Sequence, residues 1–209
     1  TELLEALSGI RKVESGEIHL FDEKISDQDS FINPRDLKEK GLAHIPEDRQ
    51  RMGLVTEFKA HENLIFGYHH QEPYSKSSIL QEKEIMSFSK KVMEEYDVRP
   101  RSPNLMTSNF SGGNQQKIIL SRELNENPKV LLIGQPTRGV DIGAIEFIHQ
   151  RLIDMRDKGA AILLVSVELE EVLSLSDRIV VMFDGNIVGE KVNKDVTDRD
   201  LGLLMAGVA

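Results

Sequence analysis

Residues Asn109–Lys117 read NFSGGNQQK, and the apolar run Val130–Ile133 is followed by QPTRGVD at Gln135–Asp141. The serine is a favourable helix cap, and the two glycines lack the Cβ atom that would keep a ligand away from the backbone. Free amide groups and the positive end of a helix dipole then make a site suited to a phosphate. When the stretch is taken alone, a plain Ser-Gly-Gly turn before a capped helix is the better explanation.

Outward from this stretch, strands and helices alternate along the chain. We expect buried strands at Val130–Ile133 and Ala161–Ser166 and a further strand at Arg178–Phe183, with helices between them. This order predicts an α/β fold with a parallel sheet covered on both faces. The DGN sequence at Asp184–Asn186 predicts a hairpin turn, and Gly16–Ile25 is expected to form one exposed antiparallel strand.

A polar, helix-prone segment interrupts the α/β pattern between about residues 58 and 110. Apolar residues recur at helical spacing from Ile85 to Tyr96. We therefore expect one domain over residues 1–209. In it, residues 1–57 and 111–209 form the α/β core with its β edge, and residues 58–110 form an inserted helical subdomain.

Composition excludes several classes of protein. The 209 residues carry a net charge of −9, which disfavours a uniformly basic nucleic-acid binder. With no cysteine, the chain has no disulfides, thiolate metal sites or cysteine nucleophiles, and its six histidines lack metal-ligand spacing. The longest apolar stretch, near Ala160–Val167, is shorter than the roughly 18 residues that a membrane span needs. Because a helix is expected to begin at Thr1 without a preceding methionine, we expect this chain to be a fragment.

The order of these motifs resembles that of the ATP-binding cassette (ABC) ATPases. The matching pattern is S-G-G-x-Q-Q, a hydrophobic strand, P-T-x-G-x-D, and a later strand ending V-S-x-E at Val165–Glu168. Glu47–Arg49, together with Thr137–Gly139, is similar to the second cassette of tandem-cassette importers for simple sugars and nucleosides. The stretch from Gly134 to His149 inclines the resemblance towards the nucleoside branch.

This resemblance implies a P-loop NTPase-like ABC cassette with ATP and Mg²⁺ as cofactors. The implied partners are a sister cassette on the same polypeptide, membrane permease subunits and, indirectly, a solute-binding protein, with no nucleic acid among them. The implied location is peripheral, on the cytoplasmic face of the cell membrane. Such cassettes pair head to tail, so that the signature of one, here Ser111–Gly113, completes the ATP site of the other.

The resemblance also assigns roles to individual positions. Thr1 occupies the family's hydroxyl position for Mg²⁺, and Glu47 stands where the Q-loop usually has glutamine. The positions implied for nucleotide binding, in this site or in the sister's, are Thr1, Glu47, Ser111, Gly112, Gly113, Gln115 and Asp141. Asp141 would act across the interface between cassettes, although a simple turn residue after Gly139 remains a fair alternative.

Three positions depart from the family's hydrolytic pattern. Gly134 and Gln135 stand where the family has an aspartate and a glutamate, and Val167 stands where it has a histidine. An amide cannot accept a proton, and glycine offers no side chain for a metal. The hypothesis is a degenerate ATP site, with little or no hydrolysis by this domain alone.

Other interpretations remain open at this point. Phe58, Leu64, Ile65 and Phe66 are either core residues or part of a groove that receives a permease. The rival functions are a soluble, non-transport ABC ATPase acting on ribosomes or nucleic acid, and a structural half-cassette that binds no nucleotide.

Overall fold

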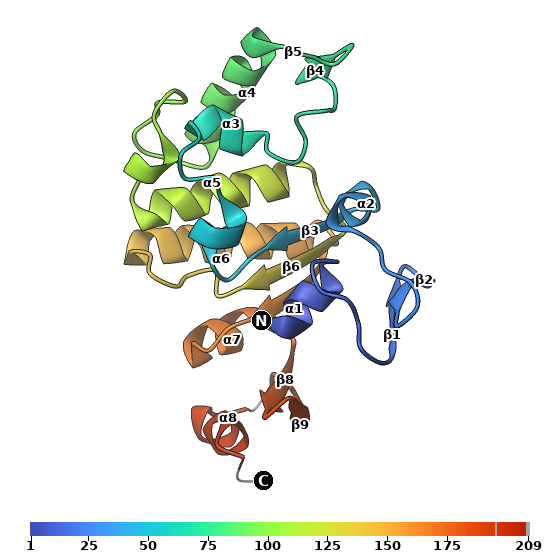
Figure 1. Cartoon of the computed structure of the whole chain (residues 1–209). Helices are drawn as coiled ribbons and strands as arrows, with labels where there is room; N and C mark the ends of the chain where they lie inside the picture. The colour runs from blue at the N-terminus through green and yellow to red at the C-terminus, as the bar shows by residue number, and fades with distance from the viewer. Residues whose placement is uncertain (195, 208–209) are drawn as a thin grey trace. The chain divides into compact units, whose positions relative to one another are not determined.

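A three-stranded sheet with the order β3-β6-β7 carries the predicted site stretches (Figure 1). Its strands are β3 (Leu42–Ile45), β6 (Val130–Gly134) and β7 (Ala161–Val165). β3 and β6 pair in parallel, with Leu42 opposite Val130 and Ile45 opposite Ile133. The apolar residues of β6 are almost all buried, as expected for a strand covered on both faces.

The computed structural model describes residues 1–194 and 196–207 of the chain. These form two compact units, Thr1–Leu163 and Leu164–Ala209. None of the described helices is both long enough and apolar enough to span a membrane.

Helices cover the strands of the first unit. α5 (Gly112–Asn125) contacts β3 and also α6 (Ile142–Asp157), while α1 (Glu2–Leu7) contacts β6 and α2 (Pro34–Glu39) contacts β3. Figure 1 shows α1 and α5 on opposite sides of these strands. Residues Ile118–Leu120 of α5 are fully buried, so the helix that begins at the predicted signature is anchored in the core.

The expectation of one strand over Gly16–Ile25 is wrong. The segment forms two antiparallel strands, β1 (Glu17–Leu20) and β2 (Glu23–Asp27). The turn between them consists of Phe21 and Asp22, which have φ angles of 51° and 62°. Two consecutive positive φ angles are typical of tight hairpin turns, usually with Asn, Asp or Gly. Phe21 is not a turn residue by type, and the alternation of apolar residues therefore concealed the turn.

The segment between residues 58 and 110 combines helices with turns and a short hairpin. It contains α3 (Ala60–Leu64), α4 (Glu82–Glu95) and the 3₁₀ turn η2 (Thr107–Asn109). A short hairpin of β4 (Ser75–Lys76) and β5 (Ile79–Leu80) precedes α4. The inserted helical subdomain and its boundaries both stay a prediction.

The four apolar residues in and beside α3, predicted either as core or as part of a permease groove, differ in their burial. Leu64 and Ile65 are buried, so they belong to the core. Phe58 and Phe66 are 39% and 44% exposed, and their rings contact each other edge to face with centroids 6.3 Å apart. Two aromatic rings thus form an exposed apolar pair.

A buried ionic network joins α2 to α5. Glu123 of α5 accepts hydrogen bonds from the Lys38 ammonium, from Arg122 Nε at 2.8 Å and from the Tyr68 hydroxyl at 3.3 Å. Burial alone would raise the pKa of Glu123, but the charges of Arg122 and Lys38 hold that pKa below its ordinary value. Burial lowers the pKa of Lys38 and raises that of Tyr68.

The second unit is built around a hairpin. It contains α7 (Leu169–Leu175), β8 (Arg178–Phe183), β9 (Asn186–Val192) and α8 (Asp198–Met205). β8 pairs antiparallel with β9, which confirms the predicted hairpin turn. β8 was expected to extend the parallel sheet. In the described residues it pairs instead with β9, because the Asp184–Asn186 turn brings the next strand directly beside it.

Candidate functional site

The parallel register of β3 and β6 brings two separated loops together. Because Ile45 lies opposite Ile133, the chain leaves both strands at the same edge of the sheet, where α/β folds usually bind ligands. Glu47, just beyond β3, accepts a hydrogen bond at Oε2 from the Thr1 hydroxyl at 2.7 Å. Its Oε1 accepts from Nη1 of Arg138 at 3.1 Å. The carboxylate thus joins the predicted Thr1 position to the loop after β6.

Gly134 at the end of β6 is closely packed. A Cβ atom added there would lie 2.9 Å from Cδ1 of Leu4 and 3.3 Å from both the backbone nitrogen and Cβ of Glu47. Any larger residue at this position therefore requires Leu4 to move. The next residue, Gln135, is only 9% exposed and has a φ angle of 47°, a left-handed conformation that non-glycine residues rarely adopt.

A cavity of about 810 Å³ lies beside Glu47. Its lining includes Thr1, Leu4, His44, Glu47 and Arg138. Small-molecule sites commonly have volumes of about 300–1,000 Å³. The cavity is therefore large enough for a ligand of the size of a nucleotide.

The oxygen atoms at this edge are of the kind that Mg²⁺ prefers. Mg²⁺ is usually held by one or two carboxylates together with phosphate and water oxygens. The Glu47 carboxylate and the Thr1 hydroxyl lie in contact, while Gly134 adds no side-chain ligand. Within residues 1–194 and 196–207, no group of three or more His, Cys, Asp or Glu side chains could hold a metal. The Glu47 carboxylate and the Thr1 hydroxyl are oxygen ligands that fit a Mg²⁺ ion whose other ligands are phosphate and water oxygens.

The loop beyond Glu47 forms a short π-helical turn, η1 (Arg49–Gly53). Asp48 caps it, since its Oδ1 accepts hydrogen bonds from the backbone amides of Gln50 at 3.2 Å and Arg51 at 3.0 Å. π-helical turns are rare and occur frequently at functional sites. The turn directs the Arg49 side chain towards the loop after β6.

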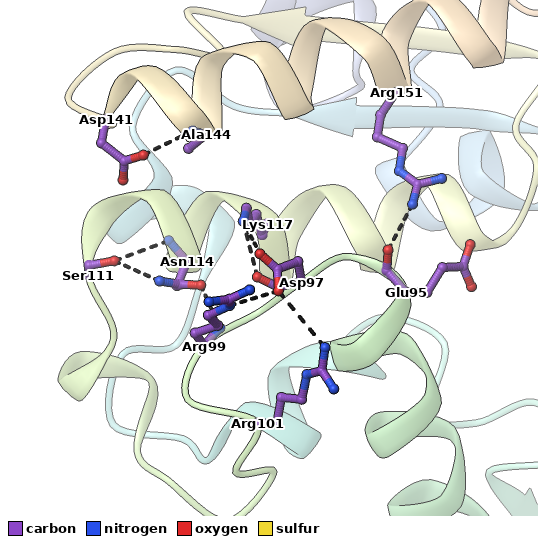
Figure 2. A network of polar contacts seen from close by, with 10 residues as sticks. All are labelled: Glu95, Asp97, Arg99, Arg101, Ser111, Asn114, Lys117, Asp141, Ala144 and Arg151. Carbon is purple, nitrogen blue, oxygen red and sulfur yellow. Dashed lines mark hydrogen bonds and ion pairs between the residues drawn. The ribbon is translucent and has the colours of Figure 1, made fainter.

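The predicted signature lies at the start of α5, as Figure 2 shows. Ser111 is exposed, and its hydroxyl caps α5 by accepting from the Asn114 amide nitrogen at 3.4 Å and from Asn114 Nδ2 at 2.8 Å. Asn114 Oδ1 in turn accepts from the backbone nitrogen of Arg99 at 2.6 Å. The helix start is thus held by polar contacts on one side while the Ser111 side chain faces solvent.

A second helix begins beside the signature. Asp141 caps α6, because its Oδ1 accepts from the Ala144 amide at 2.9 Å (Figure 2). A Cβ atom added at Gly113 would lie 3.0 Å from Oδ2 of Asp141 and 3.2 Å from Cβ of Ala144. Gly113 therefore allows α5 and α6 to approach closely, and Asp141 has a structural role in this chain. Its role across a cassette interface stays a prediction.

A set of charged side chains supports α5 one turn further along. The Lys117 ammonium lies 3.5 Å from Oδ2 of Asp97 and donates to the backbone carbonyl of Asp97 at 3.0 Å (Figure 2). Arg99 also donates to the Asp97 carboxylate, and this hydrogen bond holds the pKa of Asp97 below its ordinary value. These contacts tie the loop after α4 to the signature helix.

Gln115 and Val167 were also predicted as site positions. The Gln115 side chain is 3% exposed and donates to the backbone carbonyl of Thr107 at 3.1 Å, so it holds the loop before α5. Val167 belongs to the second unit and is 62% exposed.

Sequence reasoning assigned no separate role to Arg49 or Arg138. Arg49 donates to the backbone carbonyl of Arg138 in the loop after β6. Arg138 in turn donates to the Glu47 carboxylate. Arg49 belongs to the Glu47–Arg49 motif, and the local sequence signal for its placement is the capping residue Asp48 before it.

The burial of His44, on β3, should make the free energy of unfolding depend on pH. Burial lowers the pKa of His44 to about 4 from an ordinary value of 6.5. Because the unfolded chain binds this proton first as pH falls, the stability present above pH 6.5 is lost progressively between about 6.5 and 4. Because of His44, we expect the free energy of unfolding to be roughly 2 kcal/mol lower at pH 5 than at pH 7.

Urea unfolding at the two pH values measures this effect. His44→Asn removes the titrating group and should show a smaller loss of stability on acidification than the unmodified chain. Equal losses in the two proteins would contradict the assignment to His44.

The sequence matches the model of a known protein family. The family model described as ABC transporter matches residues 1–138, which include Glu47 and Ser111–Gly113. The chain belongs to the ABC transporter family. The matched part of this ABC transporter chain also contains Gly134 and Gln135 at the end of β6.

Relatives and a solved structure extend the comparison. The guanosine import ATP-binding protein NupO of Bacillus subtilis (strain 168) is 44% identical over 207 residues, covering 99% of this chain and 40% of that protein. The nucleoside import ATP-binding protein NupA of Lactococcus lactis subsp. cremoris (strain MG1363) is 45% identical, with the same coverage. The chain therefore spans 40% of the length of these relatives.

The fold comparison is with a nucleotide-free ATP-binding cassette from an ABC transporter. That structure has a TM-score of 0.74 at 23% identity, covering 93% of this chain and 76% of that one. The predicted fold class, a P-loop NTPase-like ABC cassette with antiparallel strand pairs beside its parallel sheet, is confirmed.

Proposed function

We propose that this chain is an ATP-binding cassette of a nucleoside importer, associated with permease subunits at the cytoplasmic face of the membrane. Support comes from NupO, named for guanosine import, and NupA, named for nucleoside import, at 44% and 45% identity. The ribose import ATP-binding protein RbsA of Oceanobacillus iheyensis is also similar, at 35% identity. Simple sugars are therefore the second candidate for the transported solute.

The cassette is the second of a tandem pair, and its own ATP site is a poor catalyst. Gly134 supports this assignment, because it is packed against Leu4 and Glu47 where the family has a metal-binding aspartate. Gln135 cannot accept the proton of an attacking water. ATP and Mg²⁺ bind at the edge formed by Thr1 and Glu47, and the amide at position 135 leaves the water unactivated.

The useful surface of this cassette is the signature, which completes the ATP site of the sister cassette. The observation that carries this proposal is the exposed, capped start of α5, where Ser111 faces solvent. The first amides of a helix and its dipole favour a phosphate at this point. The γ-phosphate held by the sister cassette would bind there.

The permease docks near α3. Phe58 and Phe66 support this placement, because they form an exposed aromatic pair a short distance along the chain from Glu47. Exposed apolar groups of this kind often mark contact surfaces. Measuring co-purification of permease subunits with Phe58→Ala and Phe66→Ala variants tests the location.

Hydrolysis by this domain alone is expected to stay near background, and Gln135→Glu should not raise it measurably. Restoring one carboxylate leaves Gly134 without a ligand, and groups of a hydrolytic site act non-additively. Steady-state ATPase assays of the purified domain and of the variant measure both rates. Robust turnover by either protein would contradict the degenerate site.

The rival functions make different predictions. A structural half-cassette gives no heat in calorimetric titration with Mg-ATP, whereas the proposed cassette binds the nucleotide. An ABC ATPase that acts on ribosomes co-purifies with RNA rather than with a permease, and the net charge of −9 counts against that function.

A further inference from the structure

Arg49 lies where three segments of the proposed interface meet. Its Nη1 donates to the backbone carbonyl of Arg138 at 2.6 Å, and its Nη2 donates to the backbone carbonyl of Gly139 at 3.2 Å. Both carbonyls belong to the loop that ends at Asp141, the cap of α6. The planar guanidinium can bridge two carbonyls in this way because its donors are held in a fixed fork.

The same guanidinium contacts the signature. A Cβ atom added at Gly112 would lie 2.6 Å from Nη2 of Arg49 and 2.8 Å from the carbonyl oxygen of Gly139. Gly112 is therefore in close contact with both, and only glycine fits without a shift. One side chain thus connects the signature and the loop before Asp141.

η1 also contacts α5 at two further positions along one face of the helix. Gln50 Nε2 donates to Oε1 of Gln115 at 3.3 Å, and a Cβ atom added at Gly53 would lie 2.7 Å from Cδ1 of Ile119. Gly112, Gln115 and Ile119 are three and four residues apart, so they lie on the same face of α5. The turn that carries Arg49 is consequently fixed to the signature helix.

The position of Arg49 is otherwise unfavourable. A cation near the start of a helix opposes the helix dipole. In addition, the Nε atom of Arg49 is buried and has no hydrogen-bond partner among the described residues. The two carbonyl contacts offset part of these costs.

We propose that Arg49 is a positioning residue that sets the signature and the loop before Asp141 in register for the sister cassette's ATP site. This inference rests on the proposed function, in which Ser111–Gly113 act in trans. ATP itself is held mainly by the sister cassette. Loss of Arg49 should therefore lower kcat far more than it changes KM, since small misplacements of catalytic groups reduce rates strongly.

The test uses the full-length importer protein assembled with its permease. Arg49→Ala and Arg49→Lys should each lower the kcat for ATP by roughly tenfold or more, with KM changed by less than about twofold. Lysine keeps the charge but cannot bridge two carbonyls, so it should not rescue the rate. Arg35→Ala is the matched control, because Arg35 is exposed on α2 and pairs only with Glu39 at 3.4 Å among the described residues.

Hydrogen exchange provides a readout that does not depend on turnover. In Arg49→Lys the backbone amides of Asn114 and Val140, which donate to the Ser111 hydroxyl and the Thr137 carbonyl, should exchange faster, while those of β6 stay protected. Normal kcat in Arg49→Lys, or unchanged exchange at those amides, would overturn the positioning role.

Ser111→Arg in the same assembly separates this inference from the proposed function. A normal rate in Ser111→Arg would mean that the proposed function itself fails. A low rate in Ser111→Arg with normal rates in both Arg49 variants would remove the positioning role alone.

Discussion

Ser111→Arg should reduce ATP turnover of the full-length importer protein by roughly a hundredfold or more, as expected when groups that stabilise transition-state charge are lost. Ser111 is exposed, so a long side chain can point into solvent without disturbing the core of this domain. In the paired cassettes the same side chain would occupy the space of the sister's γ-phosphate. Transport-coupled ATPase rate and thermal midpoint, measured together, give the result.

Ser111→Ala is the matched control for the loss of the cap. The Ser111 hydroxyl accepts from the Asn114 amide, and losing such a cap typically lowers the free energy of unfolding by about 1 kcal/mol. Both variants lose the cap, but only arginine adds bulk. Normal turnover in both variants would mean that Ser111 serves only as a helix cap.

Gly112→Asp would be a less informative variant. A Cβ atom at Gly112 meets the backbone carbonyl of Gly139 at 2.8 Å, and backbone cannot move aside as easily as the end of a side chain. Loss of activity would then mix a local distortion with any effect on the phosphate. Ser111 avoids this difficulty.

Glu123→Ala should lower the free energy of unfolding by about 3–5 kcal/mol, the range for breaking a buried ion pair. Glu123 is 1% exposed and accepts hydrogen bonds from Lys38, Arg122 and Tyr68. Removing the carboxylate leaves the buried Arg122 and the largely buried Lys38 without their counter-ion. Urea unfolding of the domain measures the change.

A double-mutant cycle with Lys38→Ala identifies the cause. If the network is responsible, the double variant should be less destabilised than the sum of the two single variants. Glu39→Ala is the control, because its exposed pair with Arg35 should contribute less than about 1 kcal/mol. Additive effects of Glu123→Ala and Lys38→Ala would show that the two groups act independently.

Much of this molecule could be predicted from local sequence. The apolar run Val130–Ile133 forms a buried strand, and the serine before two glycines caps α5, because both features depend on residues close in sequence. The Asp184–Asn186 turn was predictable for the same reason. The hairpin at Phe21 and Asp22 was not, since its positive φ angles fall partly on a residue type that rarely adopts them.

The pattern of residues predicted the ABC transporter family and the cassette fold. The surroundings of Gly134, Glu47 and Arg49 depended on contacts between distant segments. Leu4 packs against Gly134, Glu47 joins Thr1 to Arg138, and Arg49 bridges two carbonyls beside Gly112. Local propensity carries no information on such contacts, because their partners are brought together only when the parallel register of β3 and β6 and the packing of α1 and α5 are complete.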